Sequence, residues 1–491
     1  MLNLLKRHYI LLICVLGSIV RLVYGMIYEP WESSPDHLAW ELVIEQGHFD
    51  YAHLIHYPHE GGTILISLLS QLVELITSFS SLTILAFLCD FAVRFIQLKV
   101  VQKVISTEVS ILFGLWTIFA SPIIIPWGTA NFGLHSISSV FPFLIVYILF
   151  AYNSSIKYQL YGGAFLALAC WFSYSNIILV PFFFLFLVMT QVKIRKWAYT
   201  LVGFSVIALL HVLVRTQTDP GFHFSDFGLF SIRGESFSLA EIDMVERIQD
   251  VPQVVANSLT ALPHIDEYSS FFKIIIPILL LAAITGLSVS AWKKRTSWKF
   301  LLIVAIILGY FASYIISPFF YPKESGYFVM YRHLTYIAPL LALLIIMGLA
   351  SFKHKIIPIS FVILCALQSS QVFTAEKTPP NDMLTKASGW VLAFKFGHSP
   401  EDVIEIVNSN PKKSKLLIEG IGWGMCTALL QNHPDPSEKN VKASIRALND
   451  IIRSYPESYQ PLLRNGVELA FSDGITPRLH RDFLEEYQEK K

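Results

Sequence analysis

The segment between residues 28 and 60 carries the side chains best suited to chemistry. It holds seven acidic residues, no Lys or Arg, and five of the chain's fifteen histidines. Ser34 or Ser33 suits the N-cap of a helix. Pro35 would lie in the first turn of that helix and Asp36 near its positive end. At the edge of a membrane, partial loss of water would make Asp36 a useful general base. The alternative is that the acids only solvate an outer loop.

The expected helix has an apolar side and an acidic side. The apolar residues fall mainly on one face and the acids on the other, namely Leu38, Leu42 and Ile44 against Glu41 and Glu45. Gly47 is a suitable terminator. The pattern predicts a short helix that lies on the membrane surface with its acids toward water.

Three histidines of the segment recur at three-residue spacing, His53, His56 and His59, and Glu60 follows directly. Imidazole and carboxylate groups bind zinc and other divalent ions. Pro58, however, interrupts a helix that would align the three rings. We therefore favour hydrogen bonding of these side chains to lipid or to a substrate phosphate, with a divalent metal as the alternative.

Two further sites are expected at the same membrane face. Residues 126–135 form a short polar interruption between apolar runs, so Asn131 and His135 are expected at a membrane mouth, unless the segment is a plain tight turn. Arg332 precedes a late apolar run, and its guanidinium suits two-point binding of a phosphate. Snorkelling of Arg332 toward the interface is the alternative.

Arg21 lies inside the first apolar run, where a charge is costly unless paired. We expect its partner to be an outer-loop acid or a lipid phosphate.

The elements that must position these residues are membrane spans. Hydrophobic side chains make up 54% of the 491 residues and charged ones 15%, with a mean hydropathy of +0.54, whereas soluble domains carry about 25% charged residues. The charges are concentrated at the end, with 31 in the 119 residues of 373–491 and 42 in the 372 before them. This split predicts an all-α polytopic membrane domain over 1–372, followed by a small soluble helical domain over 373–491.

Charge and cysteine content exclude other classes. The formal net charge of +1 argues against nucleic acid as a partner. Four of the five cysteines lie in apolar runs, so no disulfide framework or zinc site is indicated.

Apolar runs set the expected number of crossings, because a bilayer core needs roughly 20 helical residues. Such runs occur near 8–27, 109–126, 134–152, 158–175, 177–192, 197–214, 273–291, 299–317, 333–350 and 356–372. Residues 61–98 form another apolar stretch, broken around Thr77–Ser81. Short loops rich in Lys and Arg mark the cytoplasmic face, and the acid-rich loops 28–60 and 216–272 fall on the other. Successive loops must alternate between the two faces, and this alternation predicts about 11 transmembrane helices, with the N-terminus inside and the C-terminal domain outside.

Taken in order, these features resemble the GT-C superfamily of integral-membrane glycosyltransferases, which includes protein mannosyltransferases and aminoarabinose transferases. The resemblance covers about residues 1–372. It is carried by Arg21, Asp36, Gly47, the Tyr-Pro-His-Glu-Gly-Gly sequence of 57–62 and the Arg-His-Leu-Thr-Tyr-Ile-Ala-Pro sequence of 332–339.

The resemblance implies transfer of a sugar from a polyprenyl-phosphate donor to a glycan, lipid or protein acceptor. Asp36 would deprotonate or orient the acceptor hydroxyl, and Arg332 would hold the phosphate that leaves. The expected location is a bacterial inner membrane, with the transfer and the C-terminal domain outside the cytoplasm.

The sequence departs from the family pattern in two places. His37 follows Asp36 where many members have a second adjacent acid, and residues 126–136 offer Asn131 and His135 in place of another. Glu60 is our first choice for the second acid.

The sequence of the C-terminal domain predicts helices. Helical periodicity is expected over 401–408, 415–431, 438–454 and 478–489. Gly420, Gly422 and Gly424 have the wrong spacing and context for a dinucleotide loop. A helical module that covers the active-site face, or binds an acceptor or a partner protein, fits better.

A second class of function is a non-catalytic membrane protein, such as a lipid or polysaccharide transporter or an assembly factor. Transport predicts ionisable residues at mid-membrane and repeated halves. The sequence has no convincing repeat, and Asp90 with Arg94, one helical turn apart, is the main intramembrane exception. We interpret this pair as structural and favour sugar transfer.

Overall fold

Every regular element that the structure describes is a helix, which confirms the predicted all-α class. The computed structural model describes residues 2–29, 35–46, 61–77, 79–130, 135–152, 155–189, 193–218, 244–260, 270–294, 298–316, 335–352, 354–374, 382–393, 400–431 and 438–472.

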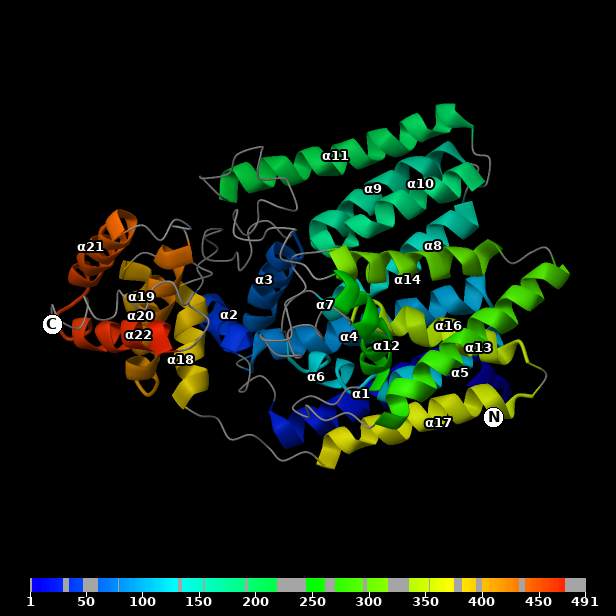
Figure 1. The fold of residues 1–491 in the computed structure, drawn as a ribbon, viewed down its shortest axis with the longest axis horizontal. Coiled ribbons are helices and arrows are strands. Elements are labelled where there is room, and N and C mark those ends of the chain that lie inside the picture. The colour runs from blue at the N-terminus through cyan, green and yellow to red at the C-terminus, as the bar shows by residue number, and fades with distance from the viewer. Residues whose placement is uncertain are drawn as a thin grey trace.

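Most of the helices form one elongated bundle (Figure 1). Its helices are α1 (Leu2–Tyr28), α3 (Gly61–Glu74), α4 (Ser81–Val104), α5 (Thr107–Phe119), α6 (Ile124–Trp127), α7 (His135–Ser138), α8 (Val140–Tyr152), α9 (Ile156–Phe172), α10 (Leu179–Met189), α11 (Ile194–Thr218), α12 (Met244–Thr260), α13 (Ser270–Lys294), α14 (Trp298–Ile316), α16 (Ala338–Ala350) and α17 (Ile356–Ser370). They follow the predicted apolar runs, including the break between α3 and α4. Helix α12, within the predicted loop 216–272, was not expected.

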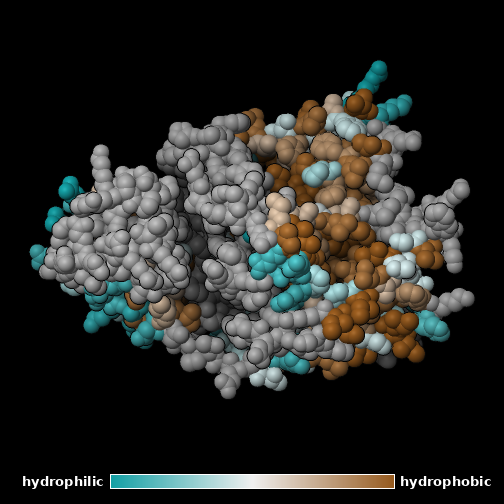
Figure 2. Space-filling view, viewed as in Figure 1, coloured by the Kyte–Doolittle hydropathy of each residue, from teal (hydrophilic) through white to brown (hydrophobic). Residues whose placement is uncertain are grey.

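The bundle has the surface of a protein that meets lipid. Three helical segments are long and apolar enough to cross a membrane, His8–Tyr28, Ile194–Val214 and Ile356–Thr374, and seven of the other described helical segments are apolar but shorter. Many large apolar side chains are exposed on the bundle, among them Leu22, Val206 and Leu367. Figure 2 shows brown apolar patches over the bundle, on the right of the view. These findings identify a membrane protein without fixing the predicted number of spans.

Helix α11 lies at the edge of the bundle against α9, and glycine explains how close the two helices come. A Cβ on Gly163 would overlap the carbonyl oxygen of Thr200, and one on Gly203 would overlap that of Leu160. The missing side chains let the two backbones touch, as is common between helices in membranes. The other side of α11 remains exposed.

The C-terminal helices form a separate core at the far end of the molecule from the start of α1 (Figure 1). They are α18 (Asp382–Val391), α19 (Pro400–Ser409), α20 (Ser414–Gln431), α21 (Glu438–Ser454) and α22 (Gln460–Ser472). Three of the four helices predicted here are confirmed within a residue or two, and the fourth, 478–489, lies outside the described residues. Helices α18 and α22 were missed.

Helix α2 (Pro35–Gln46) lies between the bundle and the C-terminal helices. Its start at Pro35 and its end just before Gly47 agree with the sequence. Its apolar side chains, expected to face the membrane, are instead covered by protein. Leu42 and Val43 are buried in the C-terminal core, and Trp40 is buried in the core of the bundle. Protein covers both faces because the C-terminal domain supplies a second apolar surface.

Candidate functional site

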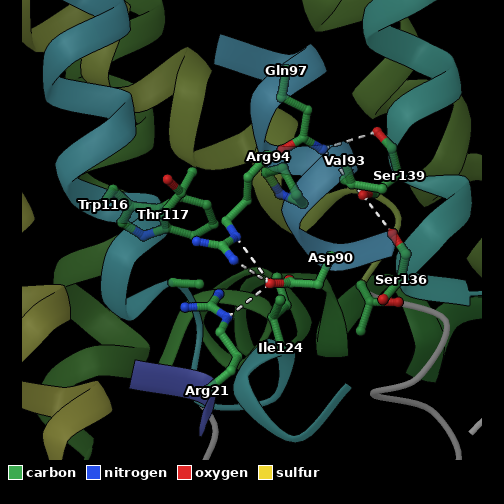
Figure 3. Close-up of a pocket in the computed structure, with 13 residues that line it drawn as sticks. Arg21, Asp90, Val93, Arg94, Gln97, Trp116, Thr117, Ile124, Ser136 and Ser139 are labelled. Carbon is green, nitrogen blue, oxygen red and sulfur yellow. Dashed lines mark hydrogen bonds and ion pairs between the residues drawn. The ribbon is translucent and has the colours of Figure 1, made fainter. Parts of the chain in front are cut away.

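A cluster of three charged side chains lies inside the bundle. Arg21 comes from α1, and Asp90 and Arg94 come from adjacent turns of α4 (Figure 3). The exposed fractions of the three residues are 0%, 7% and 3%. Two guanidinium groups share one carboxylate, so the cluster carries a formal charge of +1 in an apolar setting. Charges so placed are costly and usually functional.

Arg94 is held from three directions. Its Nε and Nη2 atoms lie 2.9 and 2.7 Å from Asp90 Oδ2. Its Nη1 donates to the carbonyl oxygen of Cys14, and its Nη2 also donates to Ser18 Oγ, each at 2.8 Å. A Cβ on Gly17 would overlap the guanidinium, so glycine makes room for it. Arg94 therefore fastens α4 to α1, and the predicted structural ion pair with Asp90 is confirmed.

Arg21 is less fully satisfied. Its Nε lies 3.2 Å from Asp90 Oδ2, and its Nη1 donates to the carbonyl oxygens of Gly17 and Ile118. Its Nη2 is buried and has no hydrogen-bond partner among the described residues. The expected outer-loop acid is not its partner among the described residues, because Asp90 of α4 takes that place. Among the described residues, the cluster therefore keeps Arg21 Nη2 as an unused donor and one excess positive charge.

The three charged residues line a small cavity. Its volume of about 20 Å³ has room for about one water molecule. Ser136, Ser139 and Thr335 also line it, so α7, the turn after it and the turn before α16 all reach this place. The cavity can accept one oxygen atom of an anion as the structure stands, and a larger group requires its wall to move.

Hydrogen bonds and backbone strain mark the walls of this cavity. Gln97 Nε2 donates to Ser139 Oγ at 3.1 Å, and Ser139 Oγ donates to the carbonyl oxygen of Ser136 at 2.6 Å (Figure 3). Ala120 ends α5 with a φ of 50°, in the left-handed region that non-glycine residues seldom adopt. Its carbonyl oxygen accepts a hydrogen bond from Ser369 Oγ at 2.6 Å, which fixes the turn. Such strain concentrates at functional sites.

Most of the predicted site residues are not described in full. Glu60, His56, His59, Asn131 and Arg332 lie outside the described residues. The backbones of Asp36 and His135 are described, as the second residue of α2 and the first of α7, but their side chains are not.

Two segments that the sequence singled out do meet at the cavity. Ser136 adjoins His135, Thr335 follows Arg332 by three residues, and both line it together with Arg21. The role of Asp90 as the partner of Arg21 was missed. The signal was an intramembrane acid with two basic residues within reach, but the sequence does not show which helices are neighbours.

Helix α2 carries a second set of buried polar groups. His37 Nε2 lies 3.6 Å from Glu41 Oε2, with the histidine fully buried and the carboxylate 14% exposed. Burial raises the pKa of Glu41, but the hydrogen bond and charge of His37, with smaller effects of Ser80 and Lys413, outweigh it and lower the pKa overall. Glu41 therefore remains ionised between the bundle and the C-terminal domain.

Comparisons with known proteins add no family. No family model matches the chain, and no curated protein matches it. Among the described residues, no three His, Cys, Asp or Glu side chains gather closely enough to hold a metal ion. The predicted histidine run lies outside that part of the chain.

Proposed function

We propose that this protein is a GT-C-like membrane glycosyltransferase that transfers a sugar from a polyprenyl-phosphate donor to an acceptor at the outer face of a membrane. The observation that carries the proposal is the buried cluster of Arg21, Asp90 and Arg94. Within the part of the chain that the structure describes, it has one excess positive charge and an unused N–H donor at a cavity inside an apolar bundle. A lipid-linked phosphate supplies the missing negative charge and reaches such a site from the bilayer.

In the proposed reaction Asp36 takes the proton of the acceptor hydroxyl as its oxygen attacks C1 of the sugar. The bond between C1 and the phosphate oxygen breaks, and polyprenyl phosphate leaves with the bonding electrons. Attack from the face opposite the leaving group inverts the anomeric centre. Arg332 and Arg21 stabilise the departing phosphate, because guanidinium groups bind two phosphate oxygens at once. Glu60 supplies the second acid of the site. The polar residues Asn131, His135, His56 and His59 bind substrate groups at the same face.

The architecture follows from the same proposal. The membrane domain over 1–372 crosses the bilayer about eleven times. The three long apolar helices and the shorter ones together make these crossings. The C-terminal domain of 373–491 lies outside the cytoplasm, at a bacterial inner membrane. Its contact with α2, which lies within loop 28–60, supports one shared face for the loop and the domain.

The same cluster gives the transport alternative its one specific support. Buried ionisable side chains within a bundle also occur along ion and substrate pathways. Transport requires access to the cluster from both sides of the membrane. A flux assay in sealed vesicles separates the classes, because a transferase changes the donor chemically and a transporter moves it unchanged.

Binding of polyprenyl phosphate tests the anion site without knowledge of the sugar or the acceptor. Native mass spectrometry of the purified protein should detect polyprenyl phosphate bound in preference to the uncharged polyprenol of equal length. Arg21→Gln and Arg332→Lys should each weaken the binding of the phosphate and leave that of the alcohol unchanged. Equal binding of the two lipids by the unaltered protein would overturn the proposal.

A further inference from the structure

Helix α2 is embedded in protein on both sides. Ala39, Leu42 and Val43 are 0%, 3% and 1% exposed and belong to the core of the C-terminal helices. Their spacing places them on one face of the helix. That face packs against α18 and α19, which lie more than 330 residues further along the chain.

A second face of α2, next to the first, is fixed to the bundle. Trp40 is 1% exposed, and its indole N–H donates a hydrogen bond to Ser67 Oγ of α3 at 2.9 Å. Helix α2 also packs against α4, which carries Asp90 and Arg94. A twelve-residue helix is marginal by itself in water, so its geometry is set by these two packed faces.

The C-terminal domain is itself tightly built where it meets α2. Helix α18 packs on α20 through Gly389 and Gly420, and a Cβ on either glycine would overlap the other helix's backbone. Helix α20 packs on α22 in the same way through Gly422 and Gly466. Close backbone contact leaves little room for sliding, so α18, which packs on α2, is held closely by α20.

We propose that the C-terminal domain positions the catalytic acid, with Leu42 and Val43 as positioning residues that transmit its hold on α2. Asp36 lies two turns before Val43 on the same helix, so a tilt of α2 displaces the backbone that carries Asp36. A shift of about 1 Å at a reacting group costs roughly 10²-fold in rate. This inference rests on the proposed role of Asp36 as the base. It assigns the domain a function in the reaction, beyond covering the active-site face.

Two substitutions of the same kind test the idea in the full-length protein. Val43→Ala removes the side chain that faces the C-terminal core from α2, and Val467→Ala removes an equally buried one from α22 in that core. Both lose the same volume. Hydrogen exchange of the α2 amides should rise roughly tenfold or more in Val43→Ala and stay unchanged in Val467→Ala, because local opening follows local packing.

Kinetics then separate a positioning role from mere stability. Val43→Ala should lower kcat with little change in the donor KM, and Val467→Ala should change neither. Unchanged exchange of α2, or faster exchange with an unchanged kcat, would overturn the proposal. If the unaltered protein transfers no sugar, the proposed function fails, and the exchange data alone still decide whether the domain holds α2.

Discussion

Arg21 on α1 and Asp90 on α4 form an ion pair inside the bundle, with 3.2 Å between Nε and Oδ2. The pair joins two helices at the cavity where two other chain segments meet. Because Asp90 also binds Arg94, one carboxylate organises both guanidinium groups. The excess positive charge and the unused Arg21 Nη2 donor follow from this two-to-one ratio.

Loss of the shared carboxylate should destabilise the protein strongly. Asp90→Asn leaves two buried guanidinium groups without a counter-charge, which costs about 3–5 kcal/mol for a broken buried pair. Thermal unfolding of the detergent-purified protein should show a large fall in Tm. Asp382→Asn, at an exposed acid of α18, serves as the control and should leave Tm unchanged. Equal Tm values for the two variants would contradict the assigned role.

Substitution of Arg94 and substitution of Arg21 should have different effects. Arg94→Lys loses the hydrogen bonds to the Cys14 carbonyl and Ser18, so it should mainly lower the stability of the α1–α4 contact. Arg21→Lys retains the charge but loses the planar donor fork, so it should mainly raise the donor KM. Tm and KM measured on both variants check this division. The same KM increase in both would show that Arg21 has no separate role.

Glycine at position 17 should be required by the cluster. A Cβ in Gly17→Ala overlaps the Arg94 guanidinium, and overpacking of this kind costs about 1–3 kcal/mol. Leu16→Ala, at a neighbouring exposed position, is the matched control and should have a smaller effect. The free energy of unfolding in denaturant gives the comparison. A Gly17→Ala variant as stable as Leu16→Ala would contradict the close packing.

Glu41 should make the stability of α2 in its packed position dependent on pH. Its pKa is lowered in the folded protein, so its stabilising effect is present above the ordinary value of 4.5 and is lost as pH falls through the lowered value. The groups that face it are His37, Lys413, Ser80 and the neighbouring acid Glu74. The protection factors of the α2 amides, which compare their exchange with that of an unfolded peptide at the same pH, should therefore fall below about pH 4.5. The Glu41→Gln variant should show a flatter profile, and identical profiles would rule out this dependence.

The sequence predicted elements far better than their partners. The break between α3 and α4 and the bounds of α21 follow from local pattern, since hydropathy and helical periodicity act within one segment. The place of α2 did not follow, because the apolar face with Leu42 meets a domain from the other end of the chain. The pairing of Arg21 with Asp90 was missed for the same reason, since only the packing of α1 on α4 brings them together.

The role of Asp36 as the base is the central claim of this account. The direct measurement is the rate of sugar transfer from a mixture of polyprenyl-phosphate sugars by the purified protein in lipid, compared with that of Asp36→Asn. The amide is nearly isosteric and cannot take the proton, so turnover should fall by roughly 10²–10⁴, the usual effect of losing a general base. Expression level and Tm should match those of the unaltered protein. Full turnover by Asp36→Asn would contradict the claim and make Glu60 the next residue to test.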